Sequence, residues 1–563
     1  KTEAAKEFLR RSLAEQDQAD VRERLRTLDP SVAPDYAVNG PQLVQPKVPE
    51  GSEAELELFD RITQLLKSGD LVPAVSDSVK LLKEFPGSAR VRWASDRILE
   101  TLISVVDKGA DKFIPVRDSV LKEMGKADPE RAAEWIRVLY NRGYWNEAAE
   151  LSRATALGGG APRSTKHLEM ALDALYAVED WKAMKHVAEV LLEKHAGTAA
   201  SRTALFRLGL QAYRDGDDPR AAQWFERLLT TSTTEGLEIQ ARYWLWRVLQ
   251  RMKNDKAQAQ ADELMRRYPF SYYGLRARLE TSGGKIEWSK ETPKLEVKTW
   301  LTAEERMAWD RAQILIGAGW FDEAQDELKI LPQPVTPEAK AIRAKILASV
   351  KSFPTAARMA NQAWDAKFEL RRMDVMRAAF PDEHRALFET AAKNKGVDPI
   401  VTRSLTKQES GYNPRAVSTS NAMGLMQMIP PTAKEIADDL KLGKLNLPDD
   451  MFEASRNIPM GTHYVAKMLG QFKGHVPLAL AAYNAGPTRL DRWLKVRGGL
   501  QGLETTRTSA PEFEVWIDEL PYSETSFYVK AILRNMLLYR VLEEGTVIAQ
   551  EPLWKSVPGS PRP

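Results

Sequence analysis

Glu409 is the residue whose setting in the sequence best suits acid–base chemistry. It ends a segment that begins at Asp398, a favoured N-cap residue, followed by Pro399 at the first helical position. Val401 and Leu405 precede Glu409 at helical spacing, so the carboxyl group continues an apolar stripe. Burial and the negative end of the helix dipole both raise a carboxyl pKa, which prepares a general acid. A solvated residue at a fraying helix end has the same spacing, so the spacing leaves both interpretations open.

The local sequence offers Glu409 no second carboxylate. Conventional glycoside hydrolysis uses two carboxyl groups, about 5 to 9.5 Å apart. After Glu409 the next acidic residue is Glu435, inside the following helical pattern. The six histidines show no zinc-like spacing, and neither a calcium loop nor a phosphate-binding glycine-rich loop is present. A second conventional carboxylate is therefore not evident locally, and we expect neither a metal nor a cofactor.

Three short strings follow one another in the C-terminal third of the chain: ESGYNP at 409–414, GLMQ at 424–427 and AYNAG at 482–486. Together and in this order they resemble the lysozyme-like domain of the soluble lytic transglycosylases. The resemblance implies an enzyme, a peptidoglycan lytic transglycosylase with a single glutamate as acid and base. Such an enzyme cleaves the β-1,4 bond between N-acetylmuramic acid and N-acetylglucosamine without water and leaves 1,6-anhydromuramyl ends.

The resemblance also assigns roles to single residues. Glu409 matches the catalytic acid/base, and the positions that match substrate-binding residues are Ser418, Gly424, Gln427, Tyr483, Asn484 and Glu524. Without the family, Tyr483 would be taken as a core aromatic. Two positions depart from the family pattern: Ser526 replaces an arginine, which puts a local ion pair in doubt, and Asn421 replaces a frequent glycine.

Two other functions remain open at this point. A goose-type lysozyme shares parts of the fold but hydrolyses the same bond with water. A non-enzymatic scaffold would use helical repeats to bind a partner and the lysozyme-like domain only to hold glycan. The presence of Glu409, Tyr483 and Asn484 favours the enzyme, and the long helical N-terminal part favours the transglycosylase.

Composition limits the class of protein. The 563 residues exceed one core, and a net charge of +3 with 28% charged residues marks no nucleic-acid binder. No apolar run approaches the roughly 18 residues of a transmembrane segment. The chain has no cysteine and begins at Lys1 rather than methionine. We expect an exported periplasmic or cell-envelope protein whose signal segment is absent from this sequence.

The elements that position these residues are predicted to be helical nearly throughout, which makes the fold predominantly all-α. Alanines at 148, 183, 221 and 257 recur in similar turn-and-restart units, 35, 38 and 36 residues apart. This period is close to the tetratricopeptide one and predicts an α-superhelix, whose surface could also hold cell-wall protein partners. Aromatic segments such as 243–246 and 268–274 fit either helix packing or carbohydrate stacking. The expected domains are a charged helix and proline-rich arm (1–50), the superhelix (51–296), a helical linker domain (297–385), the lysozyme-like domain (386–545) and a tail (546–563).

Overall fold

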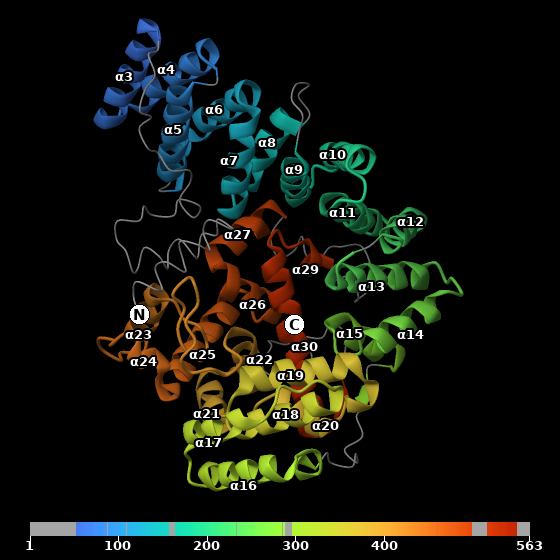
Figure 1. Ribbon diagram of the computed structural model, residues 1–563. Coiled ribbons are helices and arrows are strands. Elements are labelled where there is room, and N and C mark those ends of the chain that lie inside the picture. The colour runs from blue at the N-terminus through green and yellow to red at the C-terminus, as the bar shows by residue number, and fades with distance from the viewer. Residues whose placement is uncertain are drawn as a thin grey trace. The chain divides into compact units, whose positions relative to one another are not determined.

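The computed structural model describes residues 52–86, 88–107, 110–156, 164–231, 233–283, 285–287, 296–497 and 515–548. In these residues the predominantly α-helical fold expected from the sequence is confirmed (Figure 1). The strands β1 (Lys285–Glu287) and β2 (Thr546–Ile548) of the described residues form one antiparallel pair, with Ile286 opposite Val547. The expected N-terminal arm and most of the expected tail lie outside the described residues. No helix of the described ranges combines the length and the apolar character that crossing a membrane requires.

The contacts divide the chain into two compact units. The first comprises the chain up to Leu264 together with Thr488–Ser523, and the second comprises Met265–Pro487 together with the residues from Glu524 onward. The domain boundaries expected from the sequence stay predictions.

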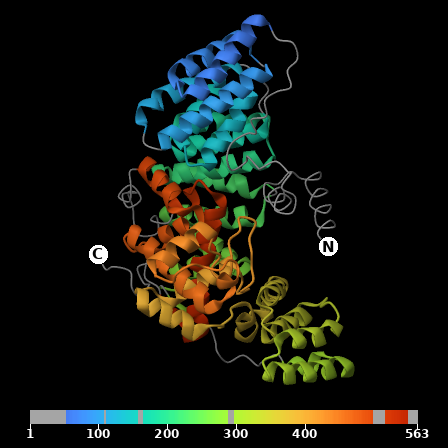
Figure 2. The same ribbon diagram turned by 90° about the vertical axis from the view of Figure 1, so that its left-hand side faces the viewer.

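The first unit is built of helical hairpins whose consecutive helices pack on one another. Figure 2 shows the blue to cyan hairpins of this unit stacked side by side. Such stacking is the architecture of helical-repeat proteins, in which each repeat is covered by its neighbours. Its elements are α3 (Glu53–Ser68), α4 (Leu71–Glu84), α5 (Ala89–Asp107), η1 (Asp111–Phe113), α6 (Ile114–Ala127), α7 (Pro129–Asn141), α8 (Trp145–Ala156), α9 (Thr165–Ala177), α10 (Trp181–Lys194), α11 (Ala199–Asp215), α12 (Asp218–Leu229), α13 (Glu235–Arg251), α14 (Ala257–Arg267, which reaches into the second unit), α27 (Pro487–Val496) and α29 (Val515–Glu519).

The recurring alanines lie near the start of the second helix of a hairpin. Ala148 and Ala221 have no exposed surface and Ala183 is 7% exposed, because a small side chain lets the paired helices approach. A left-handed backbone residue precedes each restart, at Gly143, Glu179, Gly216 and Lys253. The N-cap aspartates that follow, Asp180 and Asp217, accept hydrogen bonds from Ala183 N and Arg220 N.

The aromatic segment 243–246 belongs to the core of this unit. Tyr243, Trp244 and Trp246 are at most 2% exposed, and Tyr243 contacts each of the two tryptophans edge-on. Helix packing is therefore the correct interpretation for these rings, and carbohydrate stacking is excluded for them.

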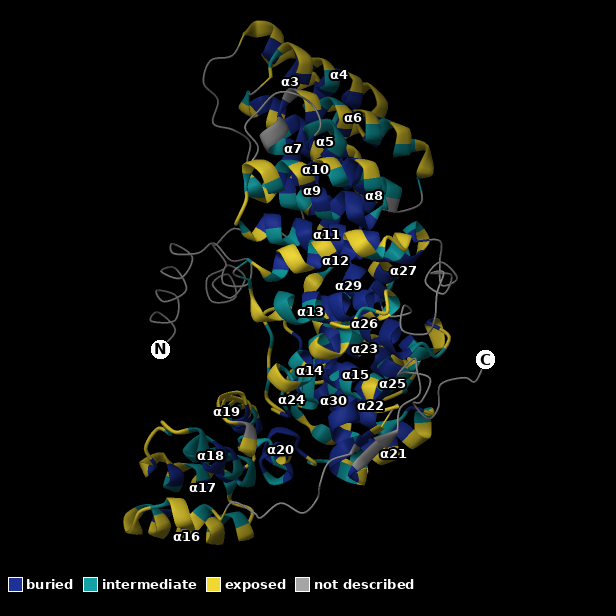
Figure 3. Cartoon of the chain, turned by 90° about the vertical axis from the view of Figure 1, so that its right-hand side faces the viewer, coloured by how far each residue is buried: buried dark blue, intermediate teal, exposed yellow. Residues whose placement is uncertain are grey.

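The second unit holds the helices that carry the three family strings. Figure 3 shows its long helix α30 buried along most of its length, which makes α30 a central element of this unit. The elements are α15 (Tyr272–Thr281), η2 (Val297–Trp300), α16 (Ala303–Gly317), α17 (Phe321–Glu327), η3 (Leu328–Ile330), α18 (Pro337–Ser349), α19 (Phe353–Ala366), η4 (Phe368–Leu370), α20 (Met373–Ala379), α21 (Arg385–Lys395), α22 (Pro399–Glu409), α23 (Pro430–Asp439), α24 (Asp449–Phe452), α25 (Ala454–Gln471), α26 (Val476–Ala485) and α30 (Ser523–Glu544), with β1 and β2.

Candidate active site

Helix α22 places Glu409 as the sequence predicts. The Asp398 side chain accepts a hydrogen bond from Ile400 N at 2.8 Å and caps the helix. Val401 and Leu405 are at most 1% exposed, so the apolar stripe faces the core. Glu409 is the last helical residue and is half-buried, and the chain then turns through Gly411 at a φ of 58°. The carboxyl group therefore stands at the edge of the core, not in open solvent.

Burial and two neighbouring side chains set the electrostatics of Glu409. The pKa of its carboxyl group is raised to about 7, and burial is the largest cause of this rise. The Tyr528 hydroxyl donates a hydrogen bond of 2.5 Å to Glu409 Oε1, which acts in the opposite direction because it stabilises the carboxylate. The negative charge of Glu524 raises the pKa further. A carboxyl group in this setting can give up a proton near neutral pH and take it back.

Tyr528 was not among the residues predicted from the sequence. It lies 119 residues beyond Glu409, on the first turns of α30, and is buried. Its position in the string ETSFYV, four residues after Glu524, was the available signal, since residues at i and i+4 share a helix face.

The loop after Glu409 is a compact structure of short bridges. Met423 pairs with Val417 and with Met428, and Ser410 Oγ donates to Leu425 O at 2.7 Å. Gly424 has a φ of 79°, and a Cβ atom there would lie 2.0 Å from Met451 O. Only glycine fits this position, so its predicted role as a place of close backbone approach has a structural basis.

Asn457 of α25 anchors this loop through hydrogen bonds. It was not among the residues predicted from the sequence. It has no exposed surface, its Oδ1 accepts from Met426 N at 2.8 Å, and its Nδ2 donates to Met423 O and Met451 O. Nothing in the local pattern marks an asparagine in the first turn of this helix as a loop anchor.

The predicted residues Ser418 and Gln427 serve the loop itself. Ser418 Oγ accepts from Ala422 N at 3.0 Å, which closes the turn. Gln427 Nε2 donates to Ala416 O and Gly424 O, so its amide oxygen is the group left for a ligand. The structure records no hydrogen bond from either side chain to Glu409 among the described residues.

Helix α26 brings Tyr483 and Asn484 to the same region. The Tyr483 hydroxyl donates to Met426 O at 2.7 Å, and its pKa lies well above the usual value because of burial and of the charge of Glu409. Asn484 Oδ1 accepts from Thr525 Oγ1 at 2.7 Å, which joins the end of α26 to the first turn of α30. Tyr483 is thus a loop anchor within electrostatic reach of Glu409.

The first turn of α30 carries the last predicted residue, Glu524. It is exposed, whereas Ser526, which stands in place of the family's arginine, is 6% exposed. The structure therefore brings together Glu409, Tyr483, Glu524 and the unpredicted Tyr528, while Asn484 is tied to the same helix turn. This cluster offers one half-buried proton donor with tyrosine neighbours, and an exposed second carboxylate on a different helix.

Comparison with known families identifies part of this region. Residues 386–504 match the transglycosylase SLT domain. The matched stretch contains α22, the loop that follows it and α26, and the resemblance expected from the three strings is confirmed.

Individual relatives are similar over about a third of the chain. The soluble lytic murein transglycosylase of Escherichia coli (strain K12) is 30% identical over 184 residues, which cover 32% of this chain and 27% of that protein. The protein of the same name from Salmonella typhimurium is 31% identical over 185 residues, with the same shares. The match thus spans about a quarter of these relatives' length.

A solved structure resembles nearly the whole chain in fold. An inactive mutant of the lytic transglycosylase Slt from Pseudomonas aeruginosa has a TM-score of 0.52 at 20% sequence identity, covering 96% of this chain and 81% of that one. At this identity the likeness concerns the fold alone.

Proposed function

We propose that this chain is a lytic transglycosylase of peptidoglycan. It cleaves the β-1,4 bond between N-acetylmuramic acid and N-acetylglucosamine without water and leaves a 1,6-anhydromuramyl end. The observation that carries the proposal is the half-buried Glu409, whose pKa is raised to about 7, inside a stretch that matches the transglycosylase SLT domain.

In the first step, protonated Glu409 donates its proton to the glycosidic oxygen as the bond to the anomeric carbon breaks. The 2-acetamido oxygen of the substrate supports the positive charge that develops at this carbon. A carboxyl group with a pKa near 7 suits this role, because much of it is protonated at neutral pH and its proton is acidic enough to transfer.

In the second step, the Glu409 carboxylate takes the proton of the muramyl 6-hydroxyl, and this oxygen bonds to the anomeric carbon. Glu409 is thereby protonated again, and no water is consumed. The nucleophile belongs to the same sugar, so its effective molarity helps it compete with solvent. The Tyr528 hydroxyl, which already donates to Glu409 Oε1, stabilises the carboxylate between the two steps.

The remaining predicted residues are proposed to hold the glycan. Gly424 and Gln427 shape the loop beside Glu409, and Ser418, Tyr483, Asn484 and Glu524 contribute hydroxyl, amide and carboxylate groups suited to sugar hydroxyls and acetamides. The proposed location is the periplasm or cell envelope, where this polymer lies. Protein partners bound by the helical repeats belong to the same proposal.

Product analysis of digested murein tests the function. Wild-type protein is expected to release fragments with anhydro ends, and Glu409→Gln is expected to release none while still binding murein. Glu435→Gln is the matched control, because Glu435 is an exposed glutamate of α23 paired with Lys467. Reducing ends would support a hydrolase, and uncut glycan with the wild type would support a scaffold; either result contradicts the proposal.

A further inference from the structure

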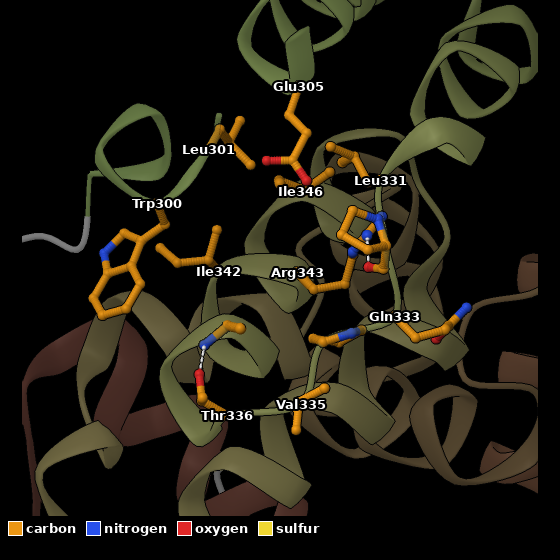
Figure 4. A pocket seen from close by; sticks show the side chains of 13 residues that line it. Trp300, Leu301, Glu305, Leu331, Gln333, Val335, Thr336, Ile342, Arg343 and Ile346 are labelled. Carbon is orange, nitrogen blue, oxygen red and sulfur yellow. Dashed lines mark hydrogen bonds between the residues drawn. The ribbon is translucent and has the colours of Figure 1, made fainter. Parts of the chain in front are cut away.

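A second candidate site lies in the second unit, outside the residues around Glu409. It is a cavity of about 270 Å³ lined by residues of η2, of α16, of α18 and of the loop between η3 and α18 (Figure 4). None of the residues of the candidate active site lines it. Its volume is near the lower end of the roughly 300–1,000 Å³ of small-molecule pockets, so it suits a ligand group of about one ring.

The floor of the cavity is apolar and firmly packed. Leu331, Ile342 and Ile346 line it and are at most 5% exposed. They belong to the hydrophobic core of α16–α18, which also contains the buried Trp309. The cavity therefore opens onto a well-ordered apolar surface that can receive a small apolar group.

The rim of the cavity distinguishes it from a packing gap. Trp300 lines it with 47% of its surface exposed, and Val335 lines it with 86% exposed. Trp309, of the same core, is only 6% exposed. A half-exposed indole beside a cavity offers a flat apolar face to a ligand. Its exposed apolar surface contributes little to the stability of the fold, which favours a role in binding.

Polar groups of both signs accompany this face. Glu305 extends from α16 toward Ile346, and Arg343 lies on α18 (Figure 4). Glu305 Oε2 accepts from Thr302 N in a capping box, and its other oxygen has no protein donor in the described part of the chain. Arg343 donates to Pro332 O, which braces the loop and leaves further N–H donors. Burial lowers the pKa of Arg343, and the negative charge of Glu305 raises it, so the two side chains interact electrostatically.

We propose that this cavity is an accessory subsite for one N-acetylated pyranose ring of a glycan strand. The C–H face of the ring lies on the Trp300 indole, and the acetamido methyl group enters the apolar floor. Ring hydroxyls donate to the Glu305 carboxylate and accept from Arg343. The inference rests on the proposed function, because it takes the glycan as the ligand.

The size of the cavity favours a saccharide over a protein partner. A stable protein interface buries roughly 1,200–2,000 Å² and is dominated by apolar anchors. Here one ring-sized cavity combines a flat indole with a carboxylate and a guanidinium, which are the hydrogen-bonding partners that sugar hydroxyls need. A second point of attachment would retain a long strand by raising its effective concentration at the catalytic cluster.

Fluorine NMR on the full chain can observe this subsite directly. The 15 tryptophans are replaced by 5-fluorotryptophan in the Glu409→Gln variant, so that the glycan is not cut. Trp300→Phe and Trp320→Phe identify two of the signals. Trp320 is the matched control, because it is 59% exposed in the same region but does not line the cavity. The probe is a soluble oligomer of β-1,4-linked N-acetylglucosamine.

The expected result is a saturable shift of the Trp300 signal with the Trp320 signal unchanged. Glu305→Gln keeps the capping box, because glutamine also serves at that position, and should weaken this titration about tenfold. A Trp300 signal that does not move, or one that moves together with Trp320, overturns the proposal. A shift caused only by self-association of the chain would indicate a protein contact and also overturns it.

The two proposals fail separately. Anhydro ends from the wild type without a Trp300 shift leave the transglycosylase standing and remove the subsite. A specific Trp300 shift without anhydro ends leaves a glycan site and removes the reaction.

Discussion

At the residue scale, the chemistry depends on opposing influences on one carboxyl group. Burial and the charge of Glu524 raise the pKa of Glu409, and the hydrogen bond from Tyr528 lowers it. The outcome, about 7, allows the same group to act first as an acid and then as a base. Changing one neighbour at a time should therefore move the pH profile in a direction that can be stated beforehand.

Tyr528→Phe should shift the alkaline limb of kcat/KM to higher pH. The tyrosine hydroxyl stabilises the carboxylate, so its removal raises the pKa of Glu409, by about one unit if the lost hydrogen bond contributes about 1.5 kcal/mol. Activity below neutral pH should fall as well, because the carboxylate is less well stabilised between the steps. Tyr464→Phe is the control, since this ring packs against Tyr483 and its hydroxyl has no recorded bond to Glu409. An unchanged limb in Tyr528→Phe would contradict this account.

Glu524→Gln should shift the same limb to lower pH. Its negative charge raises the pKa of Glu409, so a neutral amide at this position lowers it. The measurement is again kcat/KM against pH, at low ionic strength because the interacting charge is exposed and screened by salt. A shift of the Glu524→Gln limb toward higher pH would mean that Glu524 acts mainly through substrate contacts.

The raised pKa of Glu409 also predicts a stability effect. The unfolded value is near 4.5 and the folded value about 7, so the protonated form stabilises the fold below pH 4.5, and this contribution is lost as pH rises through 7. Glu409→Gln cannot ionise and should therefore be more stable than wild type at pH 8, by about 1–3 kcal/mol. Urea unfolding at pH 8 and pH 4 measures the difference, which should nearly vanish at pH 4. Equal stabilities at pH 8 would show that Glu409 ionises freely in the fold.

Part of this residue-scale arrangement could be predicted from the sequence. The cap at Asp398 and the stripe through Val401 and Leu405 are local patterns, and they placed Glu409 at the end of a buried helix face. The contact with Tyr528 spans 119 residues, and local periodicity carries no information about such pairings. The family motif supplied Glu524 but not the tyrosine one turn later.

At the element scale, the loop between α22 and α23 depends on an anchor from another helix. Asn457 satisfies Met426 N and two backbone carbonyls without any exposed surface. The Tyr483 hydroxyl donates to the carbonyl of the same Met426. The Asn457 side chain therefore fixes the loop segment beside Glu409. By holding Met426, it also fixes the carbonyl group that accepts the hydrogen bond from Tyr483.

Asn457→Ala should destabilise the protein by about 2–4 kcal/mol, because it removes the side-chain partner of Met426 N and of Met451 O, whereas Met423 O still accepts from Met428 N. Cleavage should decline beyond the loss of folded protein, since the loop beside Glu409 loosens. Thermal unfolding and activity per folded molecule are the measurements. Asn421→Gly is the control: Asn421 is exposed and has a φ of 59°, which glycine adopts without strain. Wild-type activity in folded Asn457→Ala would show that the loop needs no such anchor.

Helix boundaries and repeats could be predicted from the sequence more readily than the anchoring side chains Asn457 and Tyr483. The alanine period indicated the hairpins because a small side chain lets paired helices pack closely. Ala148 and Ala221 do so without exposed surface, whereas Ala257 is partly exposed. The residues with left-handed backbone before the second helices of the hairpins include Glu179 and Lys253. Glutamate and lysine do not favour this conformation, so the sequence carries no signal for it. Their conformation follows from the packing of the two helices rather than from their own preference.

At the scale of the whole molecule, the chain returns to its first unit after the third family string. Residues Thr488–Ser523 group with the helical repeats, although the SLT match extends to residue 504. Within that unit, Trp244 Nε1 donates to Asp518 Oδ2 at 2.8 Å and the Tyr140 hydroxyl donates to Pro521 O at 2.6 Å. The repeats therefore complete their core with a segment that follows them by more than 200 residues in the sequence.

Glu519 is the charged centre of this association. It is 3% exposed, its Oε1 accepts from the Tyr176 hydroxyl at 2.9 Å and lies 3.3 Å from Arg214, and its Oε2 lies 3.4 Å from Arg497. Arg497 is itself 8% exposed and also pairs with Glu179. Removing one partner of such a buried ion pair leaves the other charge buried and uncompensated. The resulting loss of stability is larger than the net stabilisation that the intact pair provides.

Glu519→Gln should therefore lower the stability of the first unit by about 3 kcal/mol, although the amide still accepts from Tyr176. Urea unfolding followed by far-UV circular dichroism measures the loss, and the transition of the repeats should move to lower denaturant. Lys80→Ala is the matched control, because Lys80 and Glu84 form an exposed pair at 3.9 Å, and it should change stability by less than about 0.5 kcal/mol. If both variants unfold with the wild type, the repeats hold Thr488–Ser523 by apolar packing alone, and the buried charges are dispensable to the fold.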